Sequence, residues 1–162
     1  MRRGPDGRRL TALAVVAYAE TPVGPYAEAL LAELRAPLRL HVPWIVVDSA
    51  ASARAGREHW ALPKQLASLA LDLPRSGRLV APPPVGEVGL TARPLGPWLP
   101  LAARALLDQP GRPPARLRFR GRVRPAVVRV SGGPAPGRGP GLELDGVLRL
   151  AAPVRQDGHR LG

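Results

Sequence analysis

The sequence contains no cysteine, which excludes disulfide bonds and thiolate chemistry and favours a cytoplasmic location. Aromatic residues make up only 4% of the chain, so a core must be packed mainly from leucine, valine and alanine. No apolar run approaches the roughly 20 residues that a membrane-spanning helix needs. The three histidines, His41, His59 and His159, share no spacing typical of metal ligands, and we expect no metal site.

Lysine is nearly absent. The chain has 24 lysine and arginine residues, and all except Lys64 are arginine. Arginine replaces lysine in ion pairs and on soluble surfaces, but its guanidinium stays protonated and does not form an imine. Lys64 is therefore a candidate for chemistry that only an amine can perform, although a leftover surface lysine would look the same.

The net charge of +12 predicts attraction to nucleic acid, acidic lipids or small anions, but we favour drift of the coding sequence toward arginine as its explanation. Residues 116–124 (RLRFRGRVR) alternate as a strand does. One face of that strand would carry Arg116, Arg118, Arg120, Arg122 and Arg124. A phosphate backbone could follow such a face, but only Phe119 is nearby for base stacking. We favour a solvated face or an interface with acidic partners over nucleic-acid binding.

A length of 162 residues suits one domain, which we place at 10–152 between a mobile basic head (1–9) and a frayed tail (153–162). The 21 prolines and 18 glycines predict many turns and short strands. Residues 10–19 are expected to form a buried strand. The arginines before them and the Ala17-Tyr18-Ala19 triplet also resemble a signal peptide.

Further elements follow from hydrophobic spacing and from proline and glycine positions. Strands are predicted at 38–48 and 116–124, and residues 26–34 and 142–150 fit either a strand or a helix. A short amphipathic helix is predicted at 63–71, because Leu66, Leu69 and Ala70 have helical spacing, and another helix is possible at 98–107. Loops are predicted at 49–56 and 131–141.

Two stretches form a recognisable pattern. The first is Tyr18-Ala19-Glu20 followed by Gly24-Pro25-Tyr26-Ala27-Glu28, and the second is the string GREHWALPKQL from Gly56 to Leu66. Between Tyr18 and Leu71 the chain thereby resembles the acetoacetate decarboxylase family. The resemblance implies that Lys64, the lysine after the proline, forms an imine with substrate. It also implies that Glu20, in the Tyr-x-Glu turn, contributes to the active site.

The resemblance further implies an α+β fold in which a twisted, mostly antiparallel sheet curls into a β-barrel-like core with a few short helices. It implies a homo-oligomer and a small keto-acid substrate, with no metal or organic cofactor. Periodicity by itself indicates only short strands and one or two helices.

Imine chemistry explains why a lysine is needed. A β-keto acid loses carbon dioxide easily once a protonated imine can accept the electrons of the breaking bond. The attacking amine must be neutral, whereas only about one ordinary lysine in 2,500 is neutral at pH 7. Burial among Trp60, Leu62 and Leu66 would disfavour the charged form most strongly. A helix starting at Pro63 would add a smaller effect of the same sign.

Other residues of the second stretch are candidates for substrate binding. They are Arg57, Glu58, Trp60 and Gln65. Gln65 stands where the family has a second lysine, so Arg57 would be the nearest replacement cation. The segment before the first motif, which in longer members adds an arginine near the substrate carboxylate, is expected to be missing, and an arginine elsewhere in the chain could substitute for it. Arg57 and Glu58 could instead pair with each other, Trp60 could belong to the core, and Glu28 is as readily a surface acid as a site residue.

The predicted function is a lyase that decarboxylates a small keto acid through an imine at Lys64, or performs aldol or dehydration chemistry there. The alternative is a catalytically silent, basic binding protein of the same fold that binds nucleic acid or a small anionic ligand.

Overall fold

The computed structural model describes residues 10–35, 38–134 and 136–151, and in this part the chain forms ten strands and one helix. The predicted head (1–9) and tail (153–162) lie outside the described residues. In chain order the strands are β1 (Leu10–Tyr18), β2 (Tyr26–Arg35), β3 (Arg39–Val47), β4 (Lys64–Leu66), β5 (Ser68–Asp72), β6 (Ser76–Ala81), β7 (Gly86–Pro94), β8 (Leu99–Leu107), β9 (Ala115–Gly132) and β10 (Gly137–Leu150). The helix α1 (Ala50–Trp60) connects β3 to β4.

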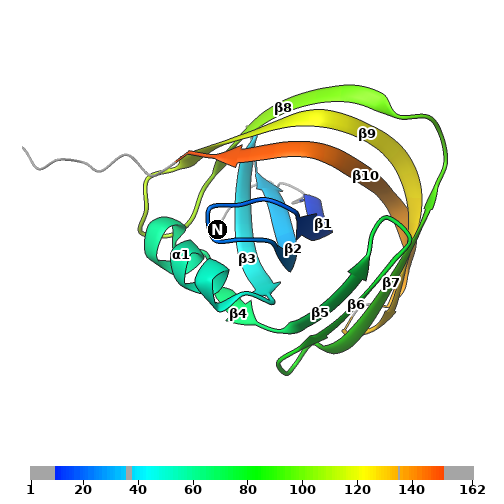
Figure 1. Ribbon diagram of the computed structural model, residues 1–162, viewed down its shortest axis with the longest axis horizontal. Helices are drawn as coiled ribbons and strands as arrows, with labels where there is room; N and C mark the ends of the chain where they lie inside the picture. The colour runs from blue at the N-terminus through cyan, green and yellow to red at the C-terminus, as the bar shows by residue number, and fades with distance from the viewer. Residues whose placement is uncertain (1–9, 36–37, 135, 152–162) are drawn as a thin grey trace, which may run out of the picture.

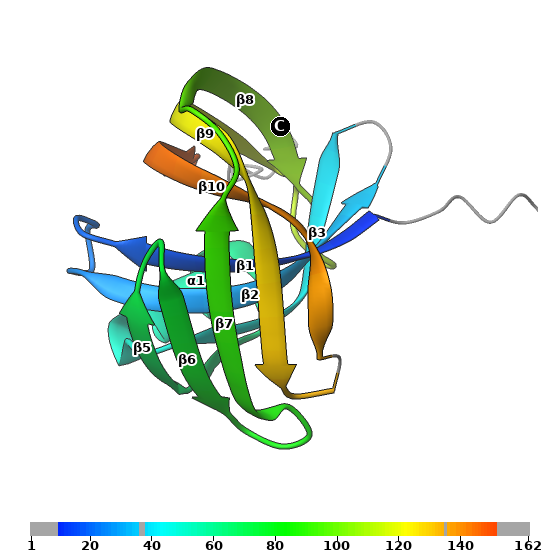
Figure 2. The same ribbon diagram turned by 90° about the vertical axis from the view of Figure 1, so that its right-hand side faces the viewer.

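All ten strands belong to one sheet. Its order is β1-β2-β3-β8-β9-β7-β6-β5, with β10 paired to β9 and β4 paired to β3. The pairs are antiparallel except for β3, which runs parallel to both β4 and β8. The sheet curls strongly, so that β8–β10 arch over one side and β5–β7 over another (Figures 1 and 2). The predicted α+β class with a mostly antiparallel, barrel-like sheet is confirmed, with one short helix.

Strand β9 is the longest element, at 18 residues, and it holds the curled sheet together. Along one edge its first part, up to Val123, pairs with β8, and its second part, from Ala126, pairs with β7. Strand β10 follows the opposite edge from Leu117 to Val130. The alternating segment 116–124 therefore is a strand, as predicted, within a longer one.

The core lies on both faces of β2 and β3, because successive side chains of a strand point to opposite faces. Ile45 and Val47 belong to a buried cluster with Ala53 of α1. Val46, between them in sequence, belongs to a second cluster that includes Leu79 and residues of β2 and β7. Polar side chains on the α1 face of β2 are therefore enclosed between sheet and helix.

Several local predictions were wrong. Residues 49–56, predicted as a loop, contain most of α1, since Ser49 caps the helix by accepting a hydrogen bond from the Ser52 backbone at 3.2 Å and alanines favour helix. The helix predicted at 63–71 is instead β4 and β5. Backbone pairing to the edge of β3 and to β6 outweighs the helical spacing of its apolar residues.

The helix predicted at 98–107 is strand β8, which is aligned against β9 over its whole length. The loop predicted at 131–141 contains the end of β9 and the start of β10. Residues 26–34 and 142–150, for which strand and helix were both open, are strands. In each case the segment is a strand because it pairs with another strand of the sheet. The spacing of apolar residues within the segment does not reveal such pairing.

Candidate active site

Lys64 is the first residue of β4 and its side chain is buried, with 6% of its surface exposed. In the sheet Lys64 is aligned with Ile45 of β3, which in turn is aligned with Leu30 of β2. Residues aligned across neighbouring strands share a face. Lys64 therefore points to the α1 side of the sheet, beneath the helix.

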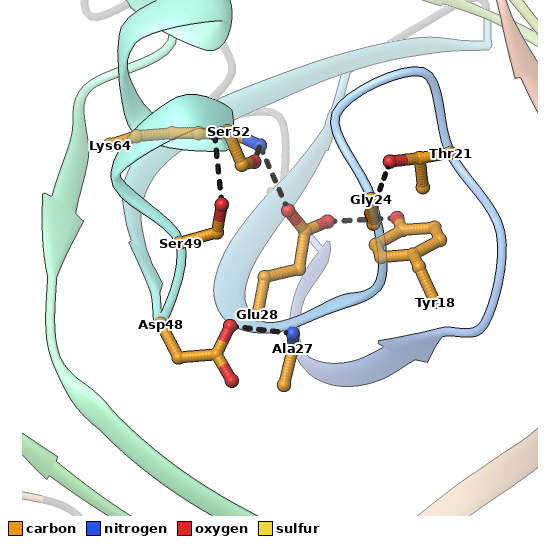
Figure 3. Close-up of polar contacts among 9 residues, drawn as sticks. All are labelled: Tyr18, Thr21, Gly24, Ala27, Glu28, Asp48, Ser49, Ser52 and Lys64. Carbon is orange, nitrogen blue, oxygen red and sulfur yellow. Dashed lines mark hydrogen bonds and ion pairs between the residues drawn. The ribbon is translucent and has the colours of Figure 1, made fainter.

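The amine of Lys64 is held by two side chains. Its Nζ lies 3.1 Å from Oε2 of Glu28 and donates a hydrogen bond of 2.9 Å to Oγ of Ser52 (Figure 3). Glu28 and Ser52 are themselves buried, with 5% and 2% of their surfaces exposed. The three groups come from β4, β2 and α1. The lone lysine of the chain is thus buried, with its amine held between a carboxylate and a hydroxyl.

The second oxygen of the Glu28 carboxylate accepts a hydrogen bond of 2.9 Å from the Tyr18 hydroxyl. Burial and, secondarily, the charge and hydrogen bond of Glu28 raise the pKa of Tyr18 far above its ordinary value. The phenol therefore stays protonated and acts as a hydrogen-bond donor. Tyr18 and Ser52 fix the carboxylate and the amine from opposite ends of one chain of hydrogen bonds.

Tyr26 covers another side of the amine. Its ring centroid lies 5.1 Å from Nζ, within the range of a cation–π contact, and 4.8 Å from the ring of Tyr18. Tyr26 and Glu28 are two residues apart in β2 and so share its α1 face. A ring face stabilises the charged amine, while the ring also excludes water from it.

Gly56 of α1 allows the lysine to pass beneath the helix. A Cβ at this position would lie 2.6 Å from Cδ and 2.8 Å from Cε of Lys64, closer than real Cβ contacts. An alanine at this position would therefore force the Lys64 side chain to shift. The neighbouring Arg57 donates a hydrogen bond of 3.0 Å to the backbone carbonyl of Lys64, which fixes β4 from outside.

The remaining predicted site residues lie at different places. Glu20 is exposed in the turn after β1 and forms no hydrogen bond or ion pair with any described residue. Glu58 and Gln65 are exposed, and the backbone carbonyl of Glu58 accepts a hydrogen bond from Arg112. Trp60 packs against the core cluster and donates its indole N–H to the carbonyl of Ala151. The carboxylate contact expected of Glu20 is made by Glu28.

Four residues around the amine were not among the predicted site residues, namely Tyr18, Tyr26, Glu28 and Ser52, although Tyr18 belongs to the first motif and Glu28 was open between a surface acid and a site residue. The triplet Tyr-Ala-Glu occurs twice, at 18–20 and at 26–28. The family resemblance pointed to the first copy as the source of the active-site glutamate. Strand alternation in the second copy would have placed Tyr26, Glu28 and Leu30 on one face. Ser52 gave no such signal, because its small, polar segment at 49–56 predicts a loop.

Within the described ranges, no group of three or more histidine, cysteine or acidic residues could hold a metal ion. The single helix in this part of the chain, α1, is too short and too polar to cross a membrane. At Lys64 the structure offers a buried amine with a carboxylate, a hydroxyl and a phenol linked to it by hydrogen bonds.

Comparison with known proteins adds information on the fold. No family model matches the sequence, and no curated protein matches it. A structure of an acetoacetate decarboxylase aligns with 90% of this chain and 77% of its own, at 13% identity and a TM-score of 0.51. The fold is similar to that of acetoacetate decarboxylase. A second structure, acetoacetate decarboxylase from Legionella pneumophila, aligns with 88% of this chain and 64% of its own, at 20% identity and a TM-score of 0.46.

Proposed function

We propose that the chain is a lyase of the acetoacetate decarboxylase type that acts on a small keto acid through an imine at Lys64. The observation that carries the proposal is the buried amine of Lys64, 3.1 Å from the Glu28 carboxylate and shielded by Tyr26. Nucleophilic lysines work as neutral amines, and a carboxylate in hydrogen-bond contact is a suitable proton acceptor. The similarity of fold and the PK-x-L string support the same conclusion.

The reaction begins when the Lys64 ammonium gives a proton to Glu28. The neutral amine attacks the ketone carbon, a C–N bond forms, and the carbonyl oxygen takes up a proton to give a carbinolamine. Loss of water leaves the protonated imine. The bond between the α-carbon and the carboxylate then breaks, carbon dioxide leaves, and the electron pair moves to the imine nitrogen as an enamine. Protonation of the α-carbon and hydrolysis release the ketone and restore Lys64.

Each contact of the cluster has a role in this sequence. Tyr18 holds one oxygen of Glu28, so the other oxygen faces the amine throughout the cycle. Ser52 accepts a hydrogen bond from Nζ and can donate to the hydroxyl of the carbinolamine, because a hydroxyl is both donor and acceptor. Glu28 is the proton acceptor in this scheme, while a role for Glu20, Arg57, Glu58, Trp60 or Gln65 in contacting substrate remains a prediction.

Borohydride trapping tests the proposal directly. Lys64 and the N-terminal α-amine are the only primary amines of the chain, so an adduct can be assigned without ambiguity. The protein is incubated with acetoacetate and sodium borohydride, digested and analysed by peptide mass. We expect a reduced adduct on Lys64 that has lost the substrate carboxyl group, because decarboxylation precedes reduction. Lys64→Arg keeps the charge but cannot form an imine, and it reports adduct formation at the α-amine alone.

The substrate panel separates the possible chemistries. A Lys64 adduct that retains the carboxyl group, with pyruvate for instance, would favour aldol or dehydration chemistry by the same imine. No Lys64 adduct with acetoacetate, pyruvate or other small keto acids would contradict the proposal and favour a silent binding protein of the same fold. A cytoplasmic location and a homo-oligomeric assembly remain predictions of the sequence.

A further inference from the structure

A second group of cations lies on the sheet formed by β8, β9 and β10, and it shares no residue with the Lys64 cluster. A hollow on this sheet is lined by Ala102, Ala103, Arg104, Arg118, Phe119, Arg120, Val147 and Arg149. The four arginines of the hollow, Arg104, Arg118, Arg120 and Arg149, are called the arginine surface below. All four are exposed. The segment 116–124 that stood out in the sequence supplies two of them.

The strand register brings these arginines side by side. Arg118 of β9 is aligned with Arg104 of β8 on one edge and with Arg149 of β10 on the other. Aligned residues share a face, and like charges directly opposite each other destabilise a sheet. Strands are spaced about 4.8 Å apart, so the three side chains start within a span of about 10 Å. Neighbouring side chains among them start about 4.8 Å apart, which is less than the Debye length of about 8 Å at physiological salt, so solvent screens their repulsion only in part.

A few residues further along the same sheet, acidic side chains neutralise the arginines of β9. Arg122 forms an ion pair of 2.8 Å with Asp145, and Arg124 forms one of 2.6 Å with Glu143. Both guanidinium groups also stack on Trp98, at 4.8 Å and 4.5 Å from its ring centroid. No member of the arginine surface forms an ion pair with any residue in the described part of the chain. Acidic partners are thus supplied at one end of the sheet and not at the other.

The chemistry of the arginine surface limits which kinds of ligand can bind to it. A second copy of this chain carries the same net charge of +12, so it would not supply the dense negative charge that the arginine surface lacks. Single-stranded nucleic acid is normally held by a series of stacking aromatic residues along a basic groove, and aromatic residues are only 4% of this chain. A compact row of guanidinium groups, each able to form two parallel hydrogen bonds with phosphate oxygens, suits a short and densely charged ligand.

We propose that the arginine surface binds a small ligand that carries two or more linked phosphate groups. Arg104, Arg118 and Arg149 would contact successive phosphates across the three strands, and Arg120, two residues along β9 from Arg118, would contact the ligand from the side. Binding would remove the repulsion that the register creates. The site is independent of imine chemistry at Lys64.

Calorimetric titration of the full chain with inorganic tripolyphosphate tests this proposal, and ATP serves as a second probe that carries the same phosphates on a nucleoside. Arg118→Gln is expected to weaken binding of both by about tenfold, the effect of losing about 1.4 kcal/mol of charge-assisted hydrogen bonding. Arg149→Gln should act similarly. Arg122→Gln is the matched control, because it removes one charge from the same face of the same strand. It should change the affinity less than about twofold, since Arg122 is already paired with Asp145.

Three results would overturn the proposal. One is equal weakening by Arg118→Gln and Arg122→Gln, which would indicate attraction by net charge alone. Another is binding of orthophosphate as tight as that of tripolyphosphate, because linked phosphates would then not be recognised. The third is failure of tripolyphosphate and ATP to bind while a single-stranded RNA oligonucleotide binds with a steep salt dependence, which would identify a nucleic-acid surface instead. Circular dichroism and thermal unfolding of each variant exclude misfolding as the cause of lost binding.

Discussion

The Lys64 cluster and the arginine surface hold their cations in opposite ways. Lys64 is a single buried charge, and its amine contacts a carboxylate, a hydroxyl and a ring face. The arginine surface has four exposed charges aligned on one sheet without an acidic neighbour among the described residues. Burial makes an unpaired charge costly, whereas water makes an unpaired surface charge tolerable. A buried charge must therefore have its partner within the fold, while an exposed group of charges can take its partner from solution.

The strongest test of this contrast is removal of the buried cation. Lys64→Met leaves Glu28 buried without its counter-charge and should lower the free energy of unfolding by about 3–5 kcal/mol. Urea denaturation at pH 7 measures the loss. The double variant Lys64→Met with Glu28→Gln removes both charges and should recover a large part of the stability. Equal stability of the single and double variants would show that the pair is not coupled.

The hydrogen bond between Tyr18 and Glu28 should have the next largest effect. Tyr18→Phe removes a donor to a charged group and should cost about 1.5–3 kcal/mol in the free energy of unfolding. Tyr26→Phe is the control, since no hydrogen bond of its hydroxyl with a described residue is observed. A loss for Tyr26→Phe as large as that for Tyr18→Phe would contradict the importance of this bond.

The raised pKa of Tyr18 makes the same bond dependent on pH. Since the pKa is higher in the folded state than in the unfolded state, the stability it contributes is complete below the unfolded value of about 10. That contribution is lost progressively as the pH rises above about 10 toward the folded value. Unfolding measured between pH 8 and pH 11, roughly the range around that value, should show a steeper alkaline loss for the native chain than for Tyr18→Phe.

Gly56→Ala should lower the free energy of unfolding by a somewhat smaller amount, which is the opposite of the usual effect of this change in a helix. Alanine normally stabilises a helix relative to glycine by about 1 kcal/mol. At position 56 the added methyl group would collide with the Lys64 side chain, and such overpacking should instead cost about 1–3 kcal/mol. The variant should also trap keto acids more slowly, because the amine is displaced. Ala51→Gly, at an exposed position of α1, is the control and should show only the ordinary helix penalty without loss of trapping.

The smallest effect is expected at the arginine surface. In the absence of ligand, Arg118→Gln should change the free energy of unfolding by no more than about 0.5 kcal/mol, because the charge is exposed. The change should be slightly stabilising at low salt and should vanish at high salt, since it relieves repulsion from Arg104 and Arg149. Thermal unfolding at two salt concentrations measures it. A clear destabilisation at low salt would show that Arg118 has a structural partner.

The sequence predicted some of these features and missed others for identifiable reasons. The barrel-like sheet and the alternating strand at 116–124 followed from resemblance and from period-two spacing. Lys64 was found because it is the only lysine and follows a proline in a distinctive string. The helix predicted around it was wrong, because three residues of β4 pair with the edge of β3, and no local pattern reveals such a parallel pairing.

The carboxylate that contacts Lys64 comes from the second of two copies of one triplet, whereas the family resemblance pointed to the first. Glu20 follows the end of β1 and is exposed, whereas Glu28 lies inside β2 and is buried. The difference arises from the hairpin between Tyr18 and Tyr26, which aligns these two residues and turns Glu28 toward α1. Ser52 was missed because recognition of α1 depended on the cap at Ser49, which a loop-like composition concealed.

The path of β9 has a consequence for how the chain can be divided. Strands β7 and β8 are neighbours in sequence, yet each occupies its own stretch of the same β9 edge. A cut in the short connection between Pro94 and Leu99 would leave β9 and β10 in the C-terminal fragment and strip β5–β7 of the strand that completes their part of the sheet. Neither fragment would contain a finished sheet by itself. The two pieces should regain structure only when mixed, which makes this connection a natural position for a split-protein reporter of assembly.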